Sequence, residues 1–516
     1  MSRAEPDLVL YNANVLTVNP LKPRGSWVVV DQGKIIVVGS GAPPLGADIH
    51  PYRAVDCAGG TLIPGFNDAH CHVLATSAAS LAVDCTPSAV SSIEDIKEKL
   101  RTRAARVPKG SWLRATGYNE FYLREMRHPN RWDLDQAAPL HPIRLIHRSG
   151  HAMVLNSRAM EATGISVHTP DPTYGVIERE DQTGEPTGLL LEMNDYLDGI
   201  LPRLSQSELE AGIRLFNDRC LSLGITSVQD ATPGNNLEQW DLFVGLKKRG
   251  LLTPYVTFMP GARHIHQFQE QGIPFGYQIK GLRLGAAKIM ATMTTGSLQP
   301  PRSELRRLVM DAHLGGFQIA VHAVEAEVVE EVLDAITFCT NRDAAGPYRH
   351  RIEHCSECRP HLMERMAING VAVVTQPSFL YYNGERYRSE IPVEKRPWLY
   401  PIRSLLASGV HLAAGSDSPV APMDPLIGIC AAVTSMAESG DEVSPGETVS
   451  VEEAIKMYTL GSAYVSFEER VSGSIEDGKR ADLVLLDKDP TLVPPEELKN
   501  LNVLMTVISG GVVWEA

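Results

Sequence analysis

Short runs of apolar and β-branched residues recur through the middle of the chain, separated by segments with helical spacing. The runs are continuously hydrophobic rather than alternating, which is typical of parallel strands buried on both faces. One helix is predicted from Ser205 to Leu223, where a Ser-x-x-Glu capping pattern precedes an apolar face and Gly224 follows. Two more are predicted over residues 325–341 and from Ser450 onward. The eight runs lie at residues 61–66, 226–229, 255–259, 283–290, 317–322, 349–353, 371–376 and 410–414.

Repeated strand–helix units of this number predict an α/β fold built on a (β/α)₈ barrel of the TIM type. The spacing breaks once, because about 160 residues separate the first run from the second, far more than the roughly 12–15 of a long loop. This stretch contains a helical segment at 92–107 and a strand-like segment at 143–147. We therefore predict an inserted subdomain at residues 73–223, placed over the C-terminal mouth of the barrel, where such folds carry their active sites.

Both ends of the chain have the pattern of strands. Neither end has enough of them for a stable sheet of its own, so we expect the two ends to pair into one composite β-sandwich domain. Its β-branched runs, separated by turn signals, lie at residues 8–18, 27–30, 34–39, 481–486 and 503–514. The predicted domains are residues 1–58 with 470–516 for the β-domain and residues 59–72 with 224–469 for the barrel.

The composition fits a globular protein and excludes several classes. Of 516 residues, 43% are hydrophobic and 21% are charged. The net charge of −14 argues against binding to nucleic acid or an anionic membrane, which needs clustered Lys and Arg. No stretch reaches the ~18 apolar residues of a membrane helix, and the N-terminus lacks a secretory-signal pattern. Only Cys355 and Cys358 form a C-x-x-C, without a matching second pair, so we expect inert thiols and a reducing, cytoplasmic location.

The strongest chemical signal is a His-x-His pair, His70 and His72, just after the first run. Residues two apart on a strand point to the same side, so two imidazoles from one strand end can bind one metal ion. Taken alone, the pair is equally well explained as ordinary core or surface histidines.

Residues of metal-ligating type also stand at the ends of other runs. His322 closes the fifth run, His354 closes the sixth and Asp417 follows the eighth, while Lys288 lies within the fourth. Singly, each has an ordinary explanation, such as a satisfied core histidine, a helix-capping Asp or a solvated Lys. In a closed parallel barrel, however, these strand ends converge on one mouth. Because imidazoles with a carboxylate suit Zn²⁺ best, the pattern predicts a zinc site.

Longer motifs accompany these residues. They are SGHA at 149–152, NS at 156–157, GEPTGL at 184–189, GITSVQDA at 224–231, RIEH at 351–354, QP at 376–377, GSDSP at 415–419 and GSIEDGKRADL at 473–483. In content and order they resemble the amidohydrolase superfamily, and within it the YtcJ-type metal-dependent hydrolases, the group that includes N-substituted formamide deformylase. The resemblance covers essentially the whole chain. It is specific for the family and the fold, and much less specific for the substrate.

The resemblance implies a role for each of the predicted ligands. His70, His72 and Asp417 would hold the more buried metal ion, and His322 and His354 would hold a second. Asp417 would also accept a proton from the metal-bound water and then pass it to the leaving nitrogen.

Two departures from the family pattern leave open whether one or two Zn²⁺ ions bind. Lys288 matches the lysine that many members carboxylate to a bridging N6-carboxylysine, but the usual Asp-Gly does not follow it. Residues 322–325 read His-Ala-Val-Glu, where the family usually has His-Ala-Ile-Gly-Asp. Glu325 is then either a first-turn helix acid favoured by the macrodipole or a proton shuttle, as in the mononuclear deaminases of the superfamily.

We therefore expect an enzyme that hydrolyses a C–N bond, other than a peptide bond, in an amide-like small molecule by means of metal-activated water. Deamination of a heterocycle at a single metal ion is the alternative. A catalytically silent binding scaffold is the third hypothesis, disfavoured because the His and Asp ligands are all kept. The resemblance also suggests a homodimer. Its further matched positions, which either contact the substrate or hold the insertion in place, are Tyr118, Glu120, Arg148, His151, Glu325 and Gln376.

Overall fold

The computed structural model describes residues 6–43, 53–172, 175–197, 199–294, 296–342 and 348–516. Residues 1–5 lie outside the described ranges. They belong to the N-terminal stretch that lacks a secretory-signal pattern. The chain divides into two compact units. The first comprises Met1–His72, Asn217–Asp417 and Met423–Ala516, and the second comprises Val73–Phe216 and Ser418–Pro422.

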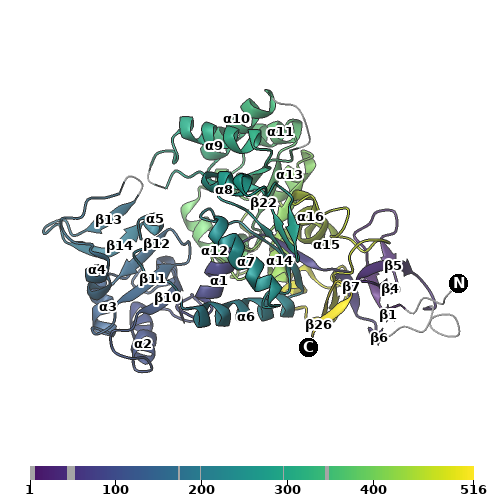
Figure 1. Cartoon of the computed structure of the whole chain (residues 1–516), viewed down its shortest axis with the longest axis horizontal. Helices are drawn as coiled ribbons and strands as arrows, with labels where there is room; N and C mark the ends of the chain where they lie inside the picture. Colours follow the sequence, from purple (N-terminus) through teal and green to yellow (C-terminus); the bar gives the residue numbers. More distant parts are fainter. Residues whose placement is uncertain (1–5, 44–52, 173–174, 198, 295, 343–347) are drawn as a thin grey trace. The chain divides into compact units, whose positions relative to one another are not determined.

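Strands from both ends of the chain form two sheets in the first unit. One sheet has the order β5 (Lys34–Gly39), β4 (Trp27–Asp31), β1 (Leu8–Tyr11) and β6 (Arg53–Asp56). The other has the order β26 (Gly511–Glu515), β25 (Val503–Ile508), β24 (Leu483–Leu486), β7 (Thr61–Pro64), β2 (Asn14–Leu16) and β3 (Arg24–Gly25). Because β24 pairs with β7, the C-terminal strands extend a sheet begun by the N-terminal ones, and Figure 1 shows them together in yellow and purple. The shared apolar core includes Leu10, Val30, Leu62, Leu483 and Val507.

Two five-stranded sheets carry the remaining strands of this unit, and apart from β17 their neighbours run parallel. The first has the order β17 (Gln278–Ile279), β18 (Leu282–Leu284), β16 (Tyr255–Phe258), β15 (Ile225–Asp230) and β8 (Phe66–Cys71). The second has the order β19 (Ala287–Met290), β20 (Ile319–Ala323), β21 (Arg351–His354), β22 (Ala372–Thr375) and β23 (Leu412–Ala414). The predicted runs from the second to the eighth are therefore confirmed as strands.

Helices alternate with these strands along the chain. The predicted helix at Ser205 is α6 (Gln206–Ser222), where the Glu208 amide donates to Ser205 Oγ at 3.3 Å. The predicted helix over residues 325–341 is α10 (Ala326–Thr340). The division between the two units falls within α6, between Phe216 and Asn217. Besides α10, the helices that lie wholly in the first unit are α7 (Leu237–Lys248), α8 (Ile265–Glu270), α9 (Arg302–Leu314), α11 (Pro360–Ile368), α12 (Ser378–Glu390), α13 (Ile402–Ala407), α14 (Pro425–Thr434), α15 (Val451–Lys456) and α16 (Ser462–Val465). Within the described ranges, every helix is too short or too polar to span a membrane.

Two details differ from the predicted barrel. The first predicted strand begins too early, because Thr61–Pro64 pairs with β2 and β24, and the parallel strand starts at Phe66. Gly65 makes this change of sheet feasible, since a Cβ there would lie 2.3 Å from Thr226 Oγ1. The fourth run is broken at Gly285 and Ala286, so that β18 pairs with β16 while β19 pairs with β20. These strands thus form two open five-stranded sheets rather than one closed barrel.

The second unit contains a mixed six-stranded sheet between two apolar cores. Its order is β13 (Val176–Arg179), β14 (Pro186–Leu191), β12 (Ala152–Leu155), β11 (Ile143–His147), β10 (Leu113–Tyr118) and β9 (Val83–Asp84). Figure 1 shows its strands beside α2 (Ile93–Ala104), α3 (Arg131–Ala137) and α4 (Ser157–Thr163). The remaining helices are α1 (Val73–Ala79) and α5 (Asn194–Leu197). Leu145 and Val154 face the core with α2 and α3, whereas Met153 and Leu155 face the core with α4.

A buried pair of imidazoles stabilises the first unit. The Ile319 amide donates to His350 Nδ1 at 3.1 Å, so Nδ1 is an acceptor and the ring proton lies on Nε2. His350 Nε2 in turn donates to His313 Nδ1 at 3.0 Å. The Tyr348 ring stacks on His350, with 5.3 Å between ring centroids. Burial, and then the neighbouring His313, lowers the pKa of His350 to about 3.

This pair predicts a loss of stability in acid. The pKa of His350 is lower in the folded protein than the ~6.5 of an unfolded histidine. Its contribution to stability is therefore complete above pH ~6.5 and is lost as the pH falls from ~6.5 towards 3. From His350 alone we expect a loss of roughly 2 kcal/mol in unfolding free energy between pH ~6.5 and ~5. The variant His350→Asn keeps an acceptor for the Ile319 amide but has no imidazole to protonate, so its loss should be smaller by that amount. Denaturant titrations of both proteins at neutral and acidic pH measure the difference, and equal pH dependence would contradict it.

Candidate metal centre

The ends of β8 and β23 bring the His-x-His pair and Asp417 together. A Cβ at Gly415 would lie 2.5 Å from the His70 amide nitrogen and 2.9 Å from Asp68 Oδ1. Only glycine therefore allows the segment after β23 to approach β8 so closely. The Asp417 amide then donates to the His70 carbonyl at 2.7 Å, and the Asp417 backbone is left-handed, with φ 58°.

Three ligand atoms converge at this point. Asp417 Oδ1 lies 3.0 Å from His72 Nε2 and 3.5 Å from His70 Nε2, and the three ligand atoms all lie within 4.8 Å of one another. The other nitrogen of each ring is held by a neighbour, since His72 Nδ1 lies 3.1 Å from Thr232 Oγ1 and His70 Nδ1 lies 2.5 Å from Glu353 Oε2. Fixing the Nδ1 atom in this way orients each ring so that its Nε2 atom faces Asp417, which is the usual arrangement around metal-binding histidines.

Glu353, which we did not predict as a functional residue, connects the histidine to a buried arginine. Arg351 is 1% exposed and Glu353 is 0% exposed. Arg351 Nε donates to Glu353 Oε1 at 2.5 Å, Nη1 donates to Gln229 Oε1 at 2.6 Å and Nη2 donates to the Ala69 carbonyl at 2.9 Å. All three nitrogens of the guanidinium group that compensates the Glu353 carboxylate thus donate hydrogen bonds. The sequence signal for this role was the RIEH motif at 351–354, in which two opposite charges stand two positions apart on one strand.

Asp68 is a second buried acid that the sequence did not single out for function. Its carboxylate accepts from Ser416 Oγ at 2.5 Å, from the Ser416 amide at 2.9 Å and from the His70 amide at 3.2 Å. Burial raises the pKa of Asp68 to about 6, although these hydrogen bonds oppose the shift. Asp68 therefore fastens the loop that carries Asp417 to the strand that carries His70.

The two remaining predicted histidine ligands lie beside this triad. The rings of His70 and His354 are 4.8 Å apart, and those of His354 and His322 are 4.4 Å apart, centroid to centroid. His354 Nδ1 lies 2.7 Å from Gln376 Oε1. Because an amide oxygen only accepts, Nδ1 carries the proton and Nε2 keeps its lone pair. Gln376, predicted as a substrate contact, thus orients His354.

Lys288 is buried in β19, with an exposed fraction of 2%. Its Nζ makes no hydrogen bond with any described residue. Burial lowers the pKa of Lys288 to about 8, while the charges of Glu353 and Asp417 act in the opposite direction. A buried amine without a partner is costly unless something else satisfies it.

The protonation states fit a cation. Burial lowers the pKa of both His70 and His354, which favours neutral imidazoles with free lone pairs. Burial alone would raise the pKa of Asp417, but the His72 hydrogen bond and the surrounding imidazoles outweigh it and hold that pKa well below its usual range. Neutral His70 and His354 imidazoles beside the Asp417 carboxylate offer nitrogen and oxygen donors of the kind that a divalent transition metal prefers.

The predicted substrate contacts of the insertion form a separate polar cluster in the second unit. Tyr118 OH lies 3.0 Å from His128 Nδ1, and Glu120 Oε2 lies 2.8 Å from His147 Nε2. Burial of Glu120 would raise its pKa, but the His147 hydrogen bond and charge outweigh that and lower the pKa to about 2. The two histidines of this cluster were not predicted.

The other predicted contacts have partners of their own. Arg148 Nε and Nη2 donate to the Val420 carbonyl at 3.3 and 3.2 Å, and His151 Nδ1 lies 2.9 Å from Glu192 Oε1. Glu325 is the N-cap residue of α10, but its side chain makes no capping bond. Its Oε2 atom is buried without a hydrogen bond to a described residue.

Comparison with known proteins identifies the family to which the chain belongs. The sequence model described as "Amidohydrolase family" matches residues 53–514, and the chain therefore belongs to the amidohydrolase family. The chain is 30% identical to N-substituted formamide deformylase of Arthrobacter pascens, over 99% of this chain and 98% of that protein. It is also 30% identical to the YtcJ amidohydrolase of Bacillus subtilis (strain 168), over 89% of each chain.

A solved structure supports the same fold. The crystal structure of an uncharacterized metal-dependent hydrolase from Pyrococcus horikoshii superimposes with a TM-score of 0.74, at 23% identity, and covers 95% of this chain and 99% of that one. The predicted family is confirmed by the sequence comparisons.

Proposed function

We propose that the protein is a metal-dependent hydrolase that cleaves the C–N bond of an amide-like small molecule. The observation that carries this proposal is the convergence of His70 Nε2, His72 Nε2 and Asp417 Oδ1 within 4.8 Å, at the ends of strands and with the Nδ1 of His70 held by Glu353. These three side chains would hold a divalent ion, for which we propose Zn²⁺, and such an ion would supply an activated water, with a pKa lowered to ~7, and would polarise a carbonyl group.

The residues of the chain supply the proton transfers. Asp417 is ionised at neutral pH because its pKa is held low, and its Oδ1 atom faces the histidines. We propose that it accepts a proton from the attacking water and then delivers that proton to the departing nitrogen, which leaves as a neutral amine. His354 and His322 would complete the donor set, with Gln376 fixing the His354 ring.

We further propose that the two parallel sheets close into one (β/α)₈ barrel. Two contacts between the sheets support this. Gly261 and Lys288 form a parallel bridge at the break in the fourth run, and the Asp417 amide donates to the His70 carbonyl where β23 approaches β8.

The insertion, which begins at Val73 directly after His72, is the proposed source of further substrate contacts through Tyr118 and Glu120. The eight free, buried cysteines support the proposed reducing, cytoplasmic setting.

N-substituted formamides are the substrates to test first, because the similarity to N-substituted formamide deformylase covers nearly the whole chain. We expect formate and the corresponding amine to appear in equal amounts. Activity should disappear when the protein is dialysed against a chelator and should return with Zn²⁺. Turnover that survives complete metal removal would contradict the proposed mechanism.

A deaminase is the second candidate function, and Glu325 favours it. Its Oε2 is buried without a described partner and lies three residues after His322 in the sequence, the position of a proton shuttle. In that case an amino-substituted heterocycle should release ammonia, at one metal ion per chain, and Glu325→Gln should abolish the release. Glu327→Gln, an exposed acid of the same helix end, is the matched control. Formate release that is unaffected by Glu325→Gln would reject the deaminase.

We propose that Lys288 is carboxylated when the metal centre is loaded. The neutral Nζ would attack the carbon of CO₂ and lose a proton, so that a new N–C bond and a carbamate anion form. Its burial without a partner supports the proposal, since the carbamate would turn an unsatisfied amine into an anionic ligand. We expect the metal content per chain to rise when bicarbonate is supplied, and the rise to vanish in Lys288→Met. Metal content independent of bicarbonate, with unmodified density at Lys288, would favour a single ion.

A further inference from the structure

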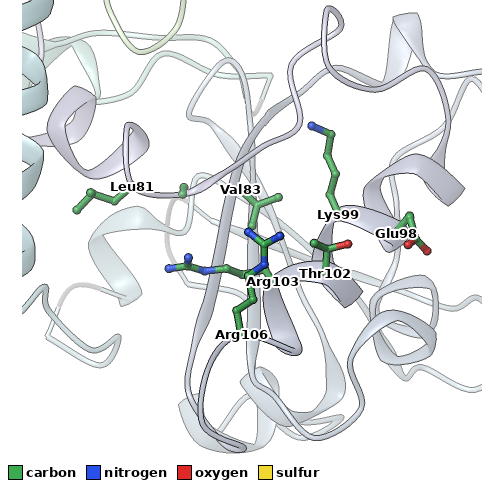
Figure 2. Close-up of a pocket in the computed structure, with 8 residues that line it drawn as sticks. Leu81, Val83, Glu98, Lys99, Thr102, Arg103 and Arg106 are labelled. Carbon is green, nitrogen blue, oxygen red and sulfur yellow. The ribbon is translucent and has the colours of Figure 1, made fainter.

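A cavity of about 300 Å³ lies in the second unit, between the start of β9 and helix α2. One wall is apolar and consists of Leu81, Ala82 and Val83. The other wall consists of residues from α2 and the turn after it, namely Glu98, Thr102 and three basic residues. We call the basic residues Lys99, Arg103 and Arg106 the α2 cation triad. Figure 2 shows the two arginine side chains beside Val83.

The triad differs from the other basic residues of the same helix. Lys97 pairs with Glu94 at 2.6 Å, and Arg101 pairs with Glu94 at 2.9 Å and with Glu98 at 3.1 Å. No member of the triad forms an ion pair or a side-chain hydrogen bond with any residue that the structure describes, although the chain carries 62 acidic residues against 48 basic ones. Of the acids of this helix, Glu98 also lines the cavity, where it pairs with Arg101 rather than with the triad, so the lining keeps an excess of positive charge.

Helix chemistry explains only part of this arrangement. Basic residues in the last helical turn are favoured by the macrodipole, which accounts for Arg101 and Arg103. It does not account for three unpaired cations around one hollow, because like charges on neighbouring helix positions repel one another. An anion placed between them would remove that repulsion.

We propose that the cavity binds a small molecule that carries a phosphate-type dianion on an apolar body. Guanidinium groups present paired donors that match phosphate oxygens, and the Thr102 hydroxyl at the same wall adds another donor. A monocarboxylate would compensate only one of the three positive charges. Leu81 and Val83 face the apolar part of the ligand. This site uses none of the residues of the metal centre, and it does not depend on the reaction proposed there.

Calorimetric titration of the full-length protein, as purified, with phenyl phosphate tests the proposal. We expect saturable binding that weakens at least tenfold in the double variant Arg103→Gln/Arg106→Gln. The matched control Arg101→Gln removes one charge from the same helix outside the cavity and should change the affinity less than twofold. Inorganic phosphate should bind more weakly than phenyl phosphate because it lacks the apolar part, and benzoate should bind more weakly because it carries a single charge.

Several results would overturn the proposal. Wild-type affinity in the double variant would place the ligand elsewhere, for instance at the metal centre. An equal loss in Arg101→Gln would show a diffuse electrostatic attraction rather than a site, and tighter binding of benzoate would exclude the dianion. Absence of saturable binding to the wild-type protein would reject the site itself. Because Arg103 and Arg106 are exposed, unchanged thermal melting of the double variant is expected and separates a binding defect from a folding defect.

Discussion

Replacing Asp417 by Asn should remove most hydrolysis while leaving the fold and most of the bound metal in place. The amide has nearly the same shape and keeps an oxygen that can ligate, but it cannot accept the proton of the attacking water. General acid–base catalysis contributes roughly 10²–10⁴-fold, and we expect a loss of that size in kcat. The backbone at this position has φ 58°, a left-handed conformation that Asn adopts readily, so the substitution adds no backbone strain.

The measurement is steady-state formate release together with metal content per chain. Asp441→Asn is the matched control, because Asp441 is an exposed acid of the same unit that pairs with Arg388. Its activity should equal that of the wild type. Undiminished turnover by Asp417→Asn, with metal present, would show that another group carries the proton.

The second large effect is expected at Glu353. The variant Glu353→Gln removes the charge that compensates Arg351 in a fully buried pair. Removing one partner of such a pair costs about 3–5 kcal/mol of unfolding free energy, because the other charge stays buried and uncompensated. The same change weakens the hold on His70 Nδ1, and loss of such an orienting carboxylate lowers metal affinity by about 10–100-fold.

A double variant separates the two consequences. In Arg351→Met/Glu353→Gln both buried charges are gone, so much of the stability should return while the metal affinity stays low. Denaturant titrations of the metal-free proteins and competition with a chelator measure the two quantities independently. If Glu353→Gln keeps both the stability and the metal affinity of the wild type, the proposed role of the carboxylate is wrong.

Much of the arrangement could be predicted from local pattern. The alternation of His70 and His72 at a strand end fixes them on one side, and parallel strands bring their ends to one edge, which is why the proximity of Asp417 to the pair was predictable. The helix at Ser205 and its capping bonds follow from short-range hydrogen bonding. Such features depend on residues close in sequence or on the shared direction of the strands.

What could not be predicted depends on contacts between distant strands. Glu353 and His70 are 283 residues apart, and only the observed register turns the carboxylate toward that imidazole. Asp68 could not be assigned to the Ser416 loop for the same reason. The first strand was placed too early because an apolar run does not reveal where a chain leaves one sheet for another; Gly65, with its close approach to Thr226, marks that point.

The position of the metal ion tests the central proposal most directly. We propose anomalous diffraction at the zinc edge from crystals of the protein grown with Zn²⁺. The proposal predicts a peak bonded to His70 Nε2, His72 Nε2 and an Asp417 oxygen, at the ~2.0–2.2 Å typical of zinc with nitrogen and oxygen ligands. A fully occupied zinc ion bound elsewhere, with no peak between these three side chains, would contradict it.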